Sequence, residues 1–248
     1  MNRTIYITSQ LNVDGQEFLV KSISYDGQNP KETVQEFGSK DFKLVQNEPI
    51  IGTIDFTFYP TGDLGAFFQN LKTQTEGDTP TRSLVSSNIG SLQNALLTSL
   101  RGEASIGSVP TMSAKFIGAV AVPLSNLASP SDSPIASIPT TENISVGGLS
   151  CAQKVSFSWD IPVIAVPTYA ESLTVPTSFF GDLPGKFTIN IDKIPTGGSS
   201  ISTISFSGFA LGFSGHEVIN SGANGAAGDL FTTFSLSIEG PASSVTFS

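Results

Sequence analysis

Residues 22–26 read SISYD, and residues 156–160 read SFSWD. Both stretches alternate apolar and polar residues, which is typical of a β-strand with one buried face. A second match comes at nearly the same offset, between residues 52–58 (GTIDFTF) and residues 185–191 (GKFTINI). We therefore predict an internal duplication in which each copy contributes one such strand pair. The alternative is two unrelated strand pairs, because short alternating strands resemble one another by chance.

The same period-two alternation runs through much of the chain, for example over residues 234–238. It predicts an all-β fold, a β-sandwich of antiparallel sheets. We expect the two halves to supply the two sheets of one compact sandwich. The alternative is that the halves take two positions of a pseudo-symmetric ring, so that three chains do the work of six.

Two segments indicate short flanking helices. Ile89, Leu92, Leu96 and Leu100 recur at helical spacing behind possible cap residues, which predicts a helix over about 87–100. A shorter helix is expected over residues 64–72. The elements after the matched strands then differ between the copies, with helices after the first and a strand pair after the second.

Loop signals divide the chain into a first β half, a connector and a second β half. Residues 123–142 hold four Pro and five Ser in sequence of low hydrophobicity, which predicts an exposed connector between residues 1–122 and 143–248. Between Phe206 and Phe209 the alternation slips by one at Gly208, which we interpret as a β-bulge. Residues 221–229 (SGANGAAGD) are expected to form a flexible hairpin tip.

The charge of the chain limits its classes of partner. The 248 residues carry a net charge of −9, with charged residues making up only 13%. A phosphate backbone is held by clustered Lys and Arg, and none cluster here, so a conventional nucleic-acid binder is not expected. A surface so poor in charge suits a protein that neighbours cover. With no signal-peptide stretch and no apolar run of membrane length, we expect synthesis in the cytoplasm and no membrane partner.

The residue types that carry most enzyme chemistry are scarce. Cys151 and His216 are the only residues of their kinds, so a thiol or histidine metal cluster cannot be assembled within one chain. We expect Cys151 to be a small buried residue and His216 to lie where a strand enters a loop. A carboxylate pair such as Asp41 and Glu48 is a remote candidate for a glycosidase site. We therefore expect no enzyme activity, no catalytic or metal site and no cofactor.

The unit formed by the SISYD-type stretch, a loop of some two dozen residues and the G-x-apolar-x-apolar strand resembles the tail tube proteins of phages. The acidic profile and the low charge density of the chain are similar to theirs as well. The resemblance covers residues 17–62 and 149–197. It implies a virion protein of the tail that joins copies of itself edge to edge into rings, as a hexamer or a trimeric pseudo-hexamer. The rings stack into a hollow tube through which DNA passes without specific binding, and other virion tail proteins are its further partners.

Within that resemblance, particular residues are expected at functional positions. The matched Asp26 and Asp160 are candidates to line the lumen, where a carboxylate repels phosphates, although each could equally cap its own turn. The long segments between the matched strands carry Phe37, Phe42, Phe179 and Phe180, which we expect at subunit contacts. The competing interpretation is that these segments fold back as extra strands and that their Phe side chains join the core.

A second function class shares this sequence pattern. A decoration, baseplate or fibre domain of a virion could be built from the same β-sandwich and would bind a capsid or a host surface. Exposed aromatic platforms would favour it. The chain holds 18 Phe but only one Trp and four Tyr, which indicates a core more than a sugar-stacking surface.

Overall fold

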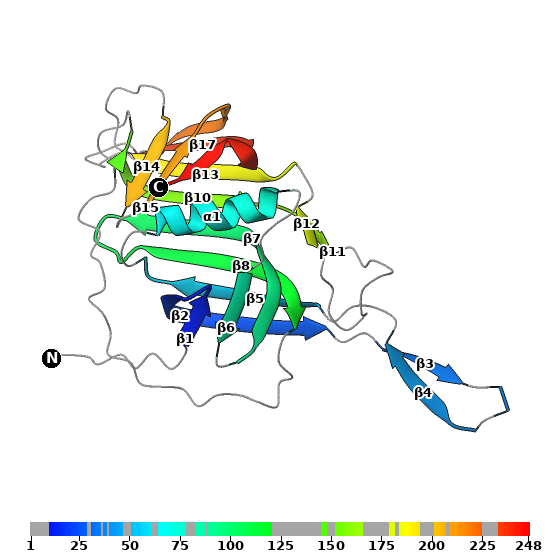
Figure 1. The fold of residues 1–248 in the computed structure, drawn as a ribbon. Helices are drawn as coiled ribbons and strands as arrows, with labels where there is room; N and C mark the ends of the chain where they lie inside the picture. The colour runs from blue at the N-terminus through cyan, green and yellow to red at the C-terminus, as the bar shows by residue number, and fades with distance from the viewer. Residues whose placement is uncertain are drawn as a thin grey trace.

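The computed structural model describes residues 10–28, 31–35, 37–38, 40–46, 51–60, 64–77, 83–87, 89–120, 145–147, 152–165, 179–181, 184–193, 201–206, 209–224 and 233–248 of the chain. These residues form antiparallel sheets with one α-helix, α1 (Gly65–Glu76) (Figure 1). The predicted all-β class is confirmed. In the described part of the chain, no helix has the length and apolar character needed to cross a membrane.

A ten-stranded sheet forms the body of the protein. Its order is β16 (Glu217–Asn224), β17 (Thr233–Pro241), β13 (Lys186–Lys193), β10 (Ala152–Asp160), β7 (Ser91–Ser105), β6 (Ser83–Ser87), β1 (Gln10–Val13), β2 (Gln16–Gln28), β5 (Ile51–Phe58) and β8 (Thr111–Val120). Strand β8 also pairs with β7, so that β7, β6, β1, β2, β5 and β8 form a closed circuit of hydrogen-bonded strands. Strand β16 lies at the remaining end of the sheet.

Three smaller sheets complete the described structure. A four-stranded sheet has the order β18 (Val245–Phe247), β15 (Phe209–Phe213), β14 (Thr203–Phe206) and β9 (Ser145–Val146), and a short 3-10 helix, η1 (Ala242–Ser244), precedes β18. The other two are strand pairs, β3 (Lys31–Gln35) with β4 (Phe42–Gln46), and β11 (Val163–Ala165) with β12 (Phe179–Gly181). The β3–β4 hairpin projects from the body of the molecule (Figure 1).

The four matched stretches of the predicted duplication all contribute strands, β2 with β5 and β10 with β13. Their registers agree as well. Tyr25 lies opposite Ile54 in the first pair, and the matching Trp159 lies opposite the matching Phe187 in the second. Equal register is not required of two unrelated strand pairs, so it supports the duplication.

The equivalence extends to two further strands in each half. The order β2-β5-β8-β7 in the first half corresponds to β10-β13-β17-β16 in the second. Strand β7 therefore corresponds to β16 and β8 to β17, and the chain order of the four strands is the same in both halves. Between the second matched strand and these strands, the first half inserts α1 and β6 and the second half inserts β14 and β15. The halves therefore differ as predicted, with helical structure after the matched strands of the first half and a strand pair after those of the second. Among the described residues, the first half has one α-helix.

The arrangement of the halves differs from the expected one. They do not supply one sheet each, because the matched strands of both halves lie in the same ten-stranded sheet. The second layer comes from the four-stranded sheet and α1, which cover one face of the large sheet. Rings from the two layers meet in the core, where Phe157 stacks on Phe209 at 5.5 Å between centroids and Phe58 on Phe68 at 5.9 Å. Burial of these apolar groups is the main stabilising term.

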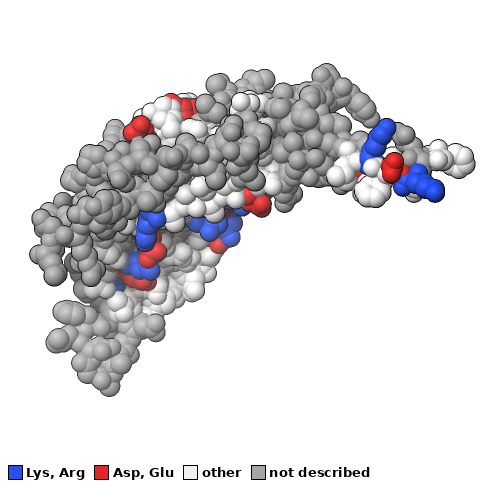
Figure 2. All heavy atoms as spheres, turned by 90° about the horizontal axis from the view of Figure 1, so that it is seen from below, with Lys and Arg blue, Asp and Glu red and all other residues white. Residues whose placement is uncertain are grey.

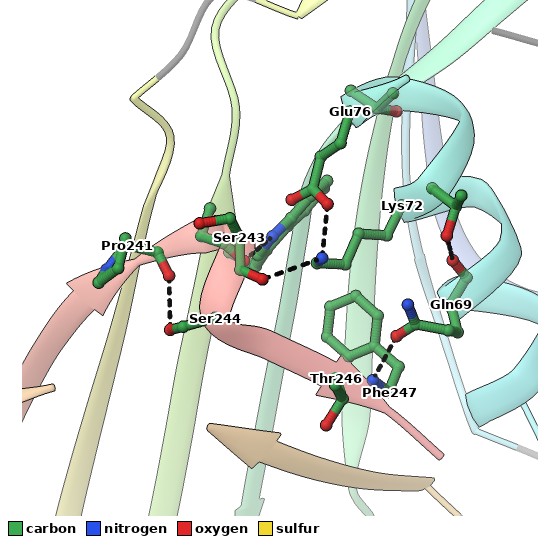
Figure 3. Close-up of polar contacts among 12 residues, drawn as sticks. Gln69, Lys72, Glu76, Pro241, Ser243, Ser244, Thr246 and Phe247 are labelled. Carbon is green, nitrogen blue, oxygen red and sulfur yellow. Dashed lines mark hydrogen bonds and ion pairs between the residues drawn. The ribbon is translucent and has the colours of Figure 1, made fainter. Parts of the chain in front are cut away.

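Helix α1 is tied to the C-terminal strand by polar contacts (Figure 3). The backbone N–H of Phe247 donates to Gln69 Oε1 at 2.8 Å. The buried Lys72 ammonium donates to Glu76 Oε2 at 2.6 Å and to the Ser243 carbonyl at 3.5 Å. These partners compensate the desolvation of a buried cation. The predicted helix over 64–72 is thus confirmed, with its end at Glu76.

The predicted helix over 87–100 is wrong, because these residues belong mainly to strands β6 and β7. Asn94 has a φ of 51°, in the left-handed region, and the pairing with β8 shifts register between Gln93 and Leu96. An extra residue in a strand changes the spacing of its buried positions. Residues four apart lie on one face of a strand as well as of a helix, so the spacing of Leu92, Leu96 and Leu100 does not distinguish the two.

Two loop predictions need correction and several lie outside the described residues. Ser205–Phe206 and Phe209–Ala210 pair as neighbouring antiparallel strands, so the slip at Gly208 is a chain reversal between β14 and β15 and not a bulge within one strand. The first four residues of the expected tip at 221–229 belong to β16. Residues 225–229, the connector 123–142 and Cys151 lie outside the described residues.

Candidate functional site

A continuous polar surface covers the face of the large sheet opposite the core. It arises from alternation, since β5 buries every second side chain, β10 does so from Val155 onward, and both turn the other side chains outward. We define the polar face as the outward residues of β2, β5, β8, β7, β10, β13 and β17. Its members include Ser22, Ser24, Asp26, Thr53, Asp55, Ser113, Lys115, Arg101, Glu103, Lys154, Ser156, Ser158, Asp160, Lys186, Thr188, Asn190 and Glu239.

The polar face is hollowed. Two adjoining hollows of about 610 and 560 Å³ share Arg101 and Ser113 among their lining residues, and both open on β7 and β8. Figure 2 shows basic and acidic side chains next to one another along a hollowed side of the molecule. Hydroxyl and charged groups line both hollows, and apolar residues such as Ile117, Pro162 and Val163 add to the lining of the smaller one. Several polar groups spread along strands give the character of a wetted surface more than of a small-molecule pocket.

The cations of the polar face lie beside acids from neighbouring strands. Lys154 Nζ lies 2.7 Å from Glu103 Oε1, and Lys186 Nζ lies 2.6 Å from Glu239 Oε1. The hydrogen bond to Glu103 raises the pKa of Lys154 above its usual value. These pairs are solvent-exposed, so ion pairing of this kind adds little to stability. Their main effect is to leave little unbalanced positive charge on the face.

Both candidate lumen residues lie on the polar face, each near the end of its strand. Asp160 Oδ1 lies 3.3 Å from Arg101 Nη2 of the adjacent strand β7. Asp26 is exposed and lies opposite Thr53. The Tyr25 hydroxyl has its pKa raised by partial burial and by the charge of Asp26. Asp160 is thus one member of an ion pair, which sequence reasoning did not identify because Arg101 is distant in the chain.

The β3–β4 hairpin carries two of the four Phe residues expected at contacts. Phe42 and Leu44 share one side of this hairpin with Thr33 and Gln35, while Val34 and Lys43 share the other. Phe37 at its tip is 109% exposed and Phe42 is 67% exposed. The competing interpretation, in which these side chains join the core, is therefore wrong for both. We call residues 31–46 the hairpin arm.

The other two expected contact residues, Phe179 and Phe180, belong to strand β12. They pair with Ala165 and Ile164 of β11. The structure does not describe the side chains of Phe179 and Phe180, so a contact role for them stays a prediction.

An apolar edge that sequence reasoning missed lies at β16. Val218 is 56% exposed and Ile219 is 53% exposed, and the register with β17 shifts between Val218 and Asn220. Two adjacent apolar residues in the otherwise polar segment EVINSGAN were the available signal. Because β16 ends the large sheet, its outer backbone groups can accept another strand.

The single histidine of the chain lies beside an aromatic ring. His216 packs its ring edge-on against Phe213, with centroids 5.0 Å apart, directly after the tight turn at Gly215. This matches the predicted place where a strand enters a loop. Among the described residues, no group of three or more His, Cys, Asp and Glu side chains is arranged to hold a metal ion. Glu48 lies outside the described residues, so the Asp41–Glu48 pair is untested.

Comparison with known proteins adds no family assignment. No protein-family model matches the chain, and no curated protein matches it either.

Proposed function

We propose that this chain is a structural subunit of a phage tail tube, a non-enzymatic virion protein that assembles with copies of itself into a hollow conduit for DNA. The observation that carries the proposal is the polar face, a broad, hollowed surface of Ser, Thr and Asn with interleaved charges. A large sheet that turns such a surface away from its core is suited to line a water-filled passage.

The charge pattern of this face agrees with passage of DNA without retention. Three of its cations, Arg101, Lys154 and Lys186, lie within 3.3 Å of a carboxylate oxygen. Lys115 lies opposite Asp55 in the strand register. Retention of a phosphate backbone requires cations that replace its counterions, and a cation already beside a carboxylate does so weakly. A lumen of this kind would be wetted and nearly neutral in local charge.

The hairpin arm supports assembly into stacked copies. It exposes Phe37, Phe42 and Leu44 to water, and apolar groups on a projecting segment are costly unless a partner covers them. In a tube the partner would be a copy in the adjacent ring. The second candidate function, a decoration, baseplate or fibre domain, would use the same arm to bind a different virion or host protein.

Negative-stain electron microscopy of the purified full chain at increasing concentration tests the proposal. Rings or tubes with a central channel are the expected result, with or without an initiator fraction from assembled tails. Discrete monomers under all of these conditions would contradict the tube and favour the binding domain.

A further inference from the structure

The chain contains, between its own two halves, a strand junction that a second copy can repeat. We infer that β16 of one copy pairs with β2 of the next copy, along residues 22–26, in the register that joins β7 to β10 inside the chain. The inference rests on the proposed self-assembly and specifies the contact through which it occurs.

The internal junction joins a strand of the first half, β7, to the first matched strand of the second half, β10. There Leu100 lies opposite Trp159 and Gly102 lies opposite Phe157. Leu100 and Trp159 are both 0% exposed, so the junction is a continuous part of the sheet and of the core. In the equivalence of the two halves, β7 corresponds to β16 and β10 corresponds to β2.

The two strands that would form the external junction have an edge available. Among the described residues, β16 pairs only with β17. Strand β2 pairs with β5 through residues 20–28, whereas β1 covers its other edge only up to Leu19. Strand β10 pairs with β13 along one edge and with β7 along the other. The edge of β2 that corresponds to the second of these has no strand beside residues 22–26 in the described structure.

Comparison of the pairings across each half fixes the register. Ala114 lies opposite Phe56 of β5, and Ile238 lies opposite the matching Ile189 of β13, so Ala114 and Ile238 are equivalent. Leu100 lies opposite Ala114 and Val218 lies opposite Ile238, so Leu100 corresponds to Val218. Trp159 corresponds to Tyr25. The external junction therefore places Val218 opposite Tyr25. By the same mapping, Asn220 lies opposite Ser24 and Ser221 opposite Ile23.

This register covers apolar surface that the single chain exposes. Val218 is on the core side of the sheet, opposite the buried Ile238, and yet it is 56% exposed. Tyr25 is on the core side too and is only partly buried, whereas its counterpart Trp159 is fully buried. Pairing of the two strands would bury both side chains against each other and would satisfy the backbone groups of both edges.

The contact is heterologous, since it joins two different edges. Inside the chain, the β7–β10 junction joins the first four-strand unit to the second as neighbours in one sheet. Repetition of that junction between chains would place successive units in the same relation, so that every unit continues the polar face of the one before. A heterologous contact of this kind produces a closed ring when the rotation closes.

Paired cysteines test the contact and its register. In a Cys151→Ala background, Ser24→Cys and Asn220→Cys are placed in separate chains, because directly opposed residues of antiparallel strands lie within disulfide range. Under mild oxidation the mixture of the two single variants should give a covalent dimer, and neither variant alone should do so. The double variant should give a ladder of covalent oligomers on a non-reducing gel. The matched control joins Ser24→Cys with Asn224→Cys, which is displaced by four residues along β16 and should remain monomeric.

The outcomes separate this inference from the proposed function. Suppose that tubes or rings form in the microscope but the Ser24–Asn220 disulfide does not, or that the Asn224 control cross-links equally well. Either outcome would overturn the register while the tube proposal stands. Dimers formed by either single variant alone would indicate a symmetric contact and would also overturn it. Absence of both assemblies and disulfides at every concentration would overturn the inference together with the tube. Circular dichroism of each variant before oxidation shows whether the fold is kept.

Discussion

Tyr25 holds in the first half of the chain the position that Trp159 holds in the second, and the two differ in burial. Trp159 is enclosed and donates its indole N–H to the Ala242 carbonyl at 3.2 Å. Tyr25 keeps part of its ring exposed beside the uncovered edge of β2. The same repeat position is therefore a core position in one half and an edge position in the other.

This difference predicts that truncation of the two aromatic side chains has different effects on stability and on assembly. Trp159→Ala should lower the free energy of unfolding by about 3–5 kcal/mol, because it leaves a cavity in a packed core. Tyr25→Ala should cost the isolated chain clearly less and should instead reduce assembly. Urea denaturation of both variants, together with light scattering, checks the pair. Equal losses of stability would show that Tyr25 is a core position like Trp159, and unchanged assembly of Tyr25→Ala would show that the edge of β2 is not an interface.

The hairpin arm predicts a variant that folds but assembles poorly. Phe37→Ala and Phe42→Ala together should leave the melting temperature of the isolated chain nearly unchanged, because both side chains are exposed. Assembly measured by light scattering or microscopy should decrease. Phe68→Ala is the matched control, since it removes a buried Phe and should lower stability by about 3–5 kcal/mol. A large loss of stability in the arm variant would mean that the arm packs on its own chain.

Neutralising acids on the polar face should create affinity for DNA. In the triple variant Glu103→Gln, Asp160→Asn and Glu239→Gln, the ion-paired cations of the polar face lose their carboxylates. The variant should bind double-stranded DNA at low salt, with an affinity that falls as salt rises, while the unmodified chain does not bind.

The control for this experiment removes the same charge elsewhere. Asp14→Asn, Glu32→Gln and Asp41→Asn alter three exposed acids outside the polar face. Equal DNA binding by both triple variants in a gel-shift assay would mean that net charge alone decides, and that the polar face has no special part in it.

The sequence predicts strands where alternation is regular and fails where the backbone departs from it. Residues 155–159 and 187–191 alternate without interruption, and both are strands with the expected buried side. Around Asn94 an extra residue interrupts the alternation, and the leucines four residues apart fit one face of a helix as well as of a strand. Asn tolerates the left-handed region better than most residues, so its presence in an apolar segment was the available signal.

The placement of the halves and the composition of the polar face depend on strand order, which a local pattern does not encode. Asp160 could be assigned to a strand end, but its partner Arg101 is brought beside it only by the pairing of β10 with β7. The exposure of Phe37 and Phe42 agrees with the unusual length of their segment, so this part of the candidate site could be predicted. The edge at Val218 could not, because it requires knowledge of which strand ends the sheet.

The strained position at Asn94 gives a further test. Asn94→Gly should keep stability within about 1 kcal/mol, because Gly adopts a positive φ freely. Asn94→Val should lower the free energy of unfolding by about 1–2 kcal/mol or more, since a β-branched side chain is disfavoured there. Thermal melts of the two variants measure the difference. If Val proves as stable as Gly, the extra residue does not lie at Asn94.

The inferred junction places two acids opposite each other, and this gives a prediction for its charge. Ser99 lies opposite Asp160 at the internal junction, and the mapping converts this pair into Glu217 opposite Asp26. Directly opposed like charges oppose strand pairing by about 0.2–1 kcal/mol. Association of the unmodified chain should therefore strengthen with added salt, which screens the repulsion.

Reversing one of these charges should reverse the effect. Glu217→Lys replaces a like-charge pair by an opposite-charge pair, so it should lower the concentration needed for assembly and should make assembly weaken with salt. Glu217→Gln should fall between the two, and Asp26→Lys with Glu217 unchanged should behave as Glu217→Lys does. The double variant Asp26→Lys with Glu217→Lys restores like charges and should return the assembly threshold toward that of the unmodified chain. Sedimentation at a series of salt concentrations measures the assembly of all four variants. If the effects of Asp26→Lys and Glu217→Lys simply add in the double variant, the two residues do not meet.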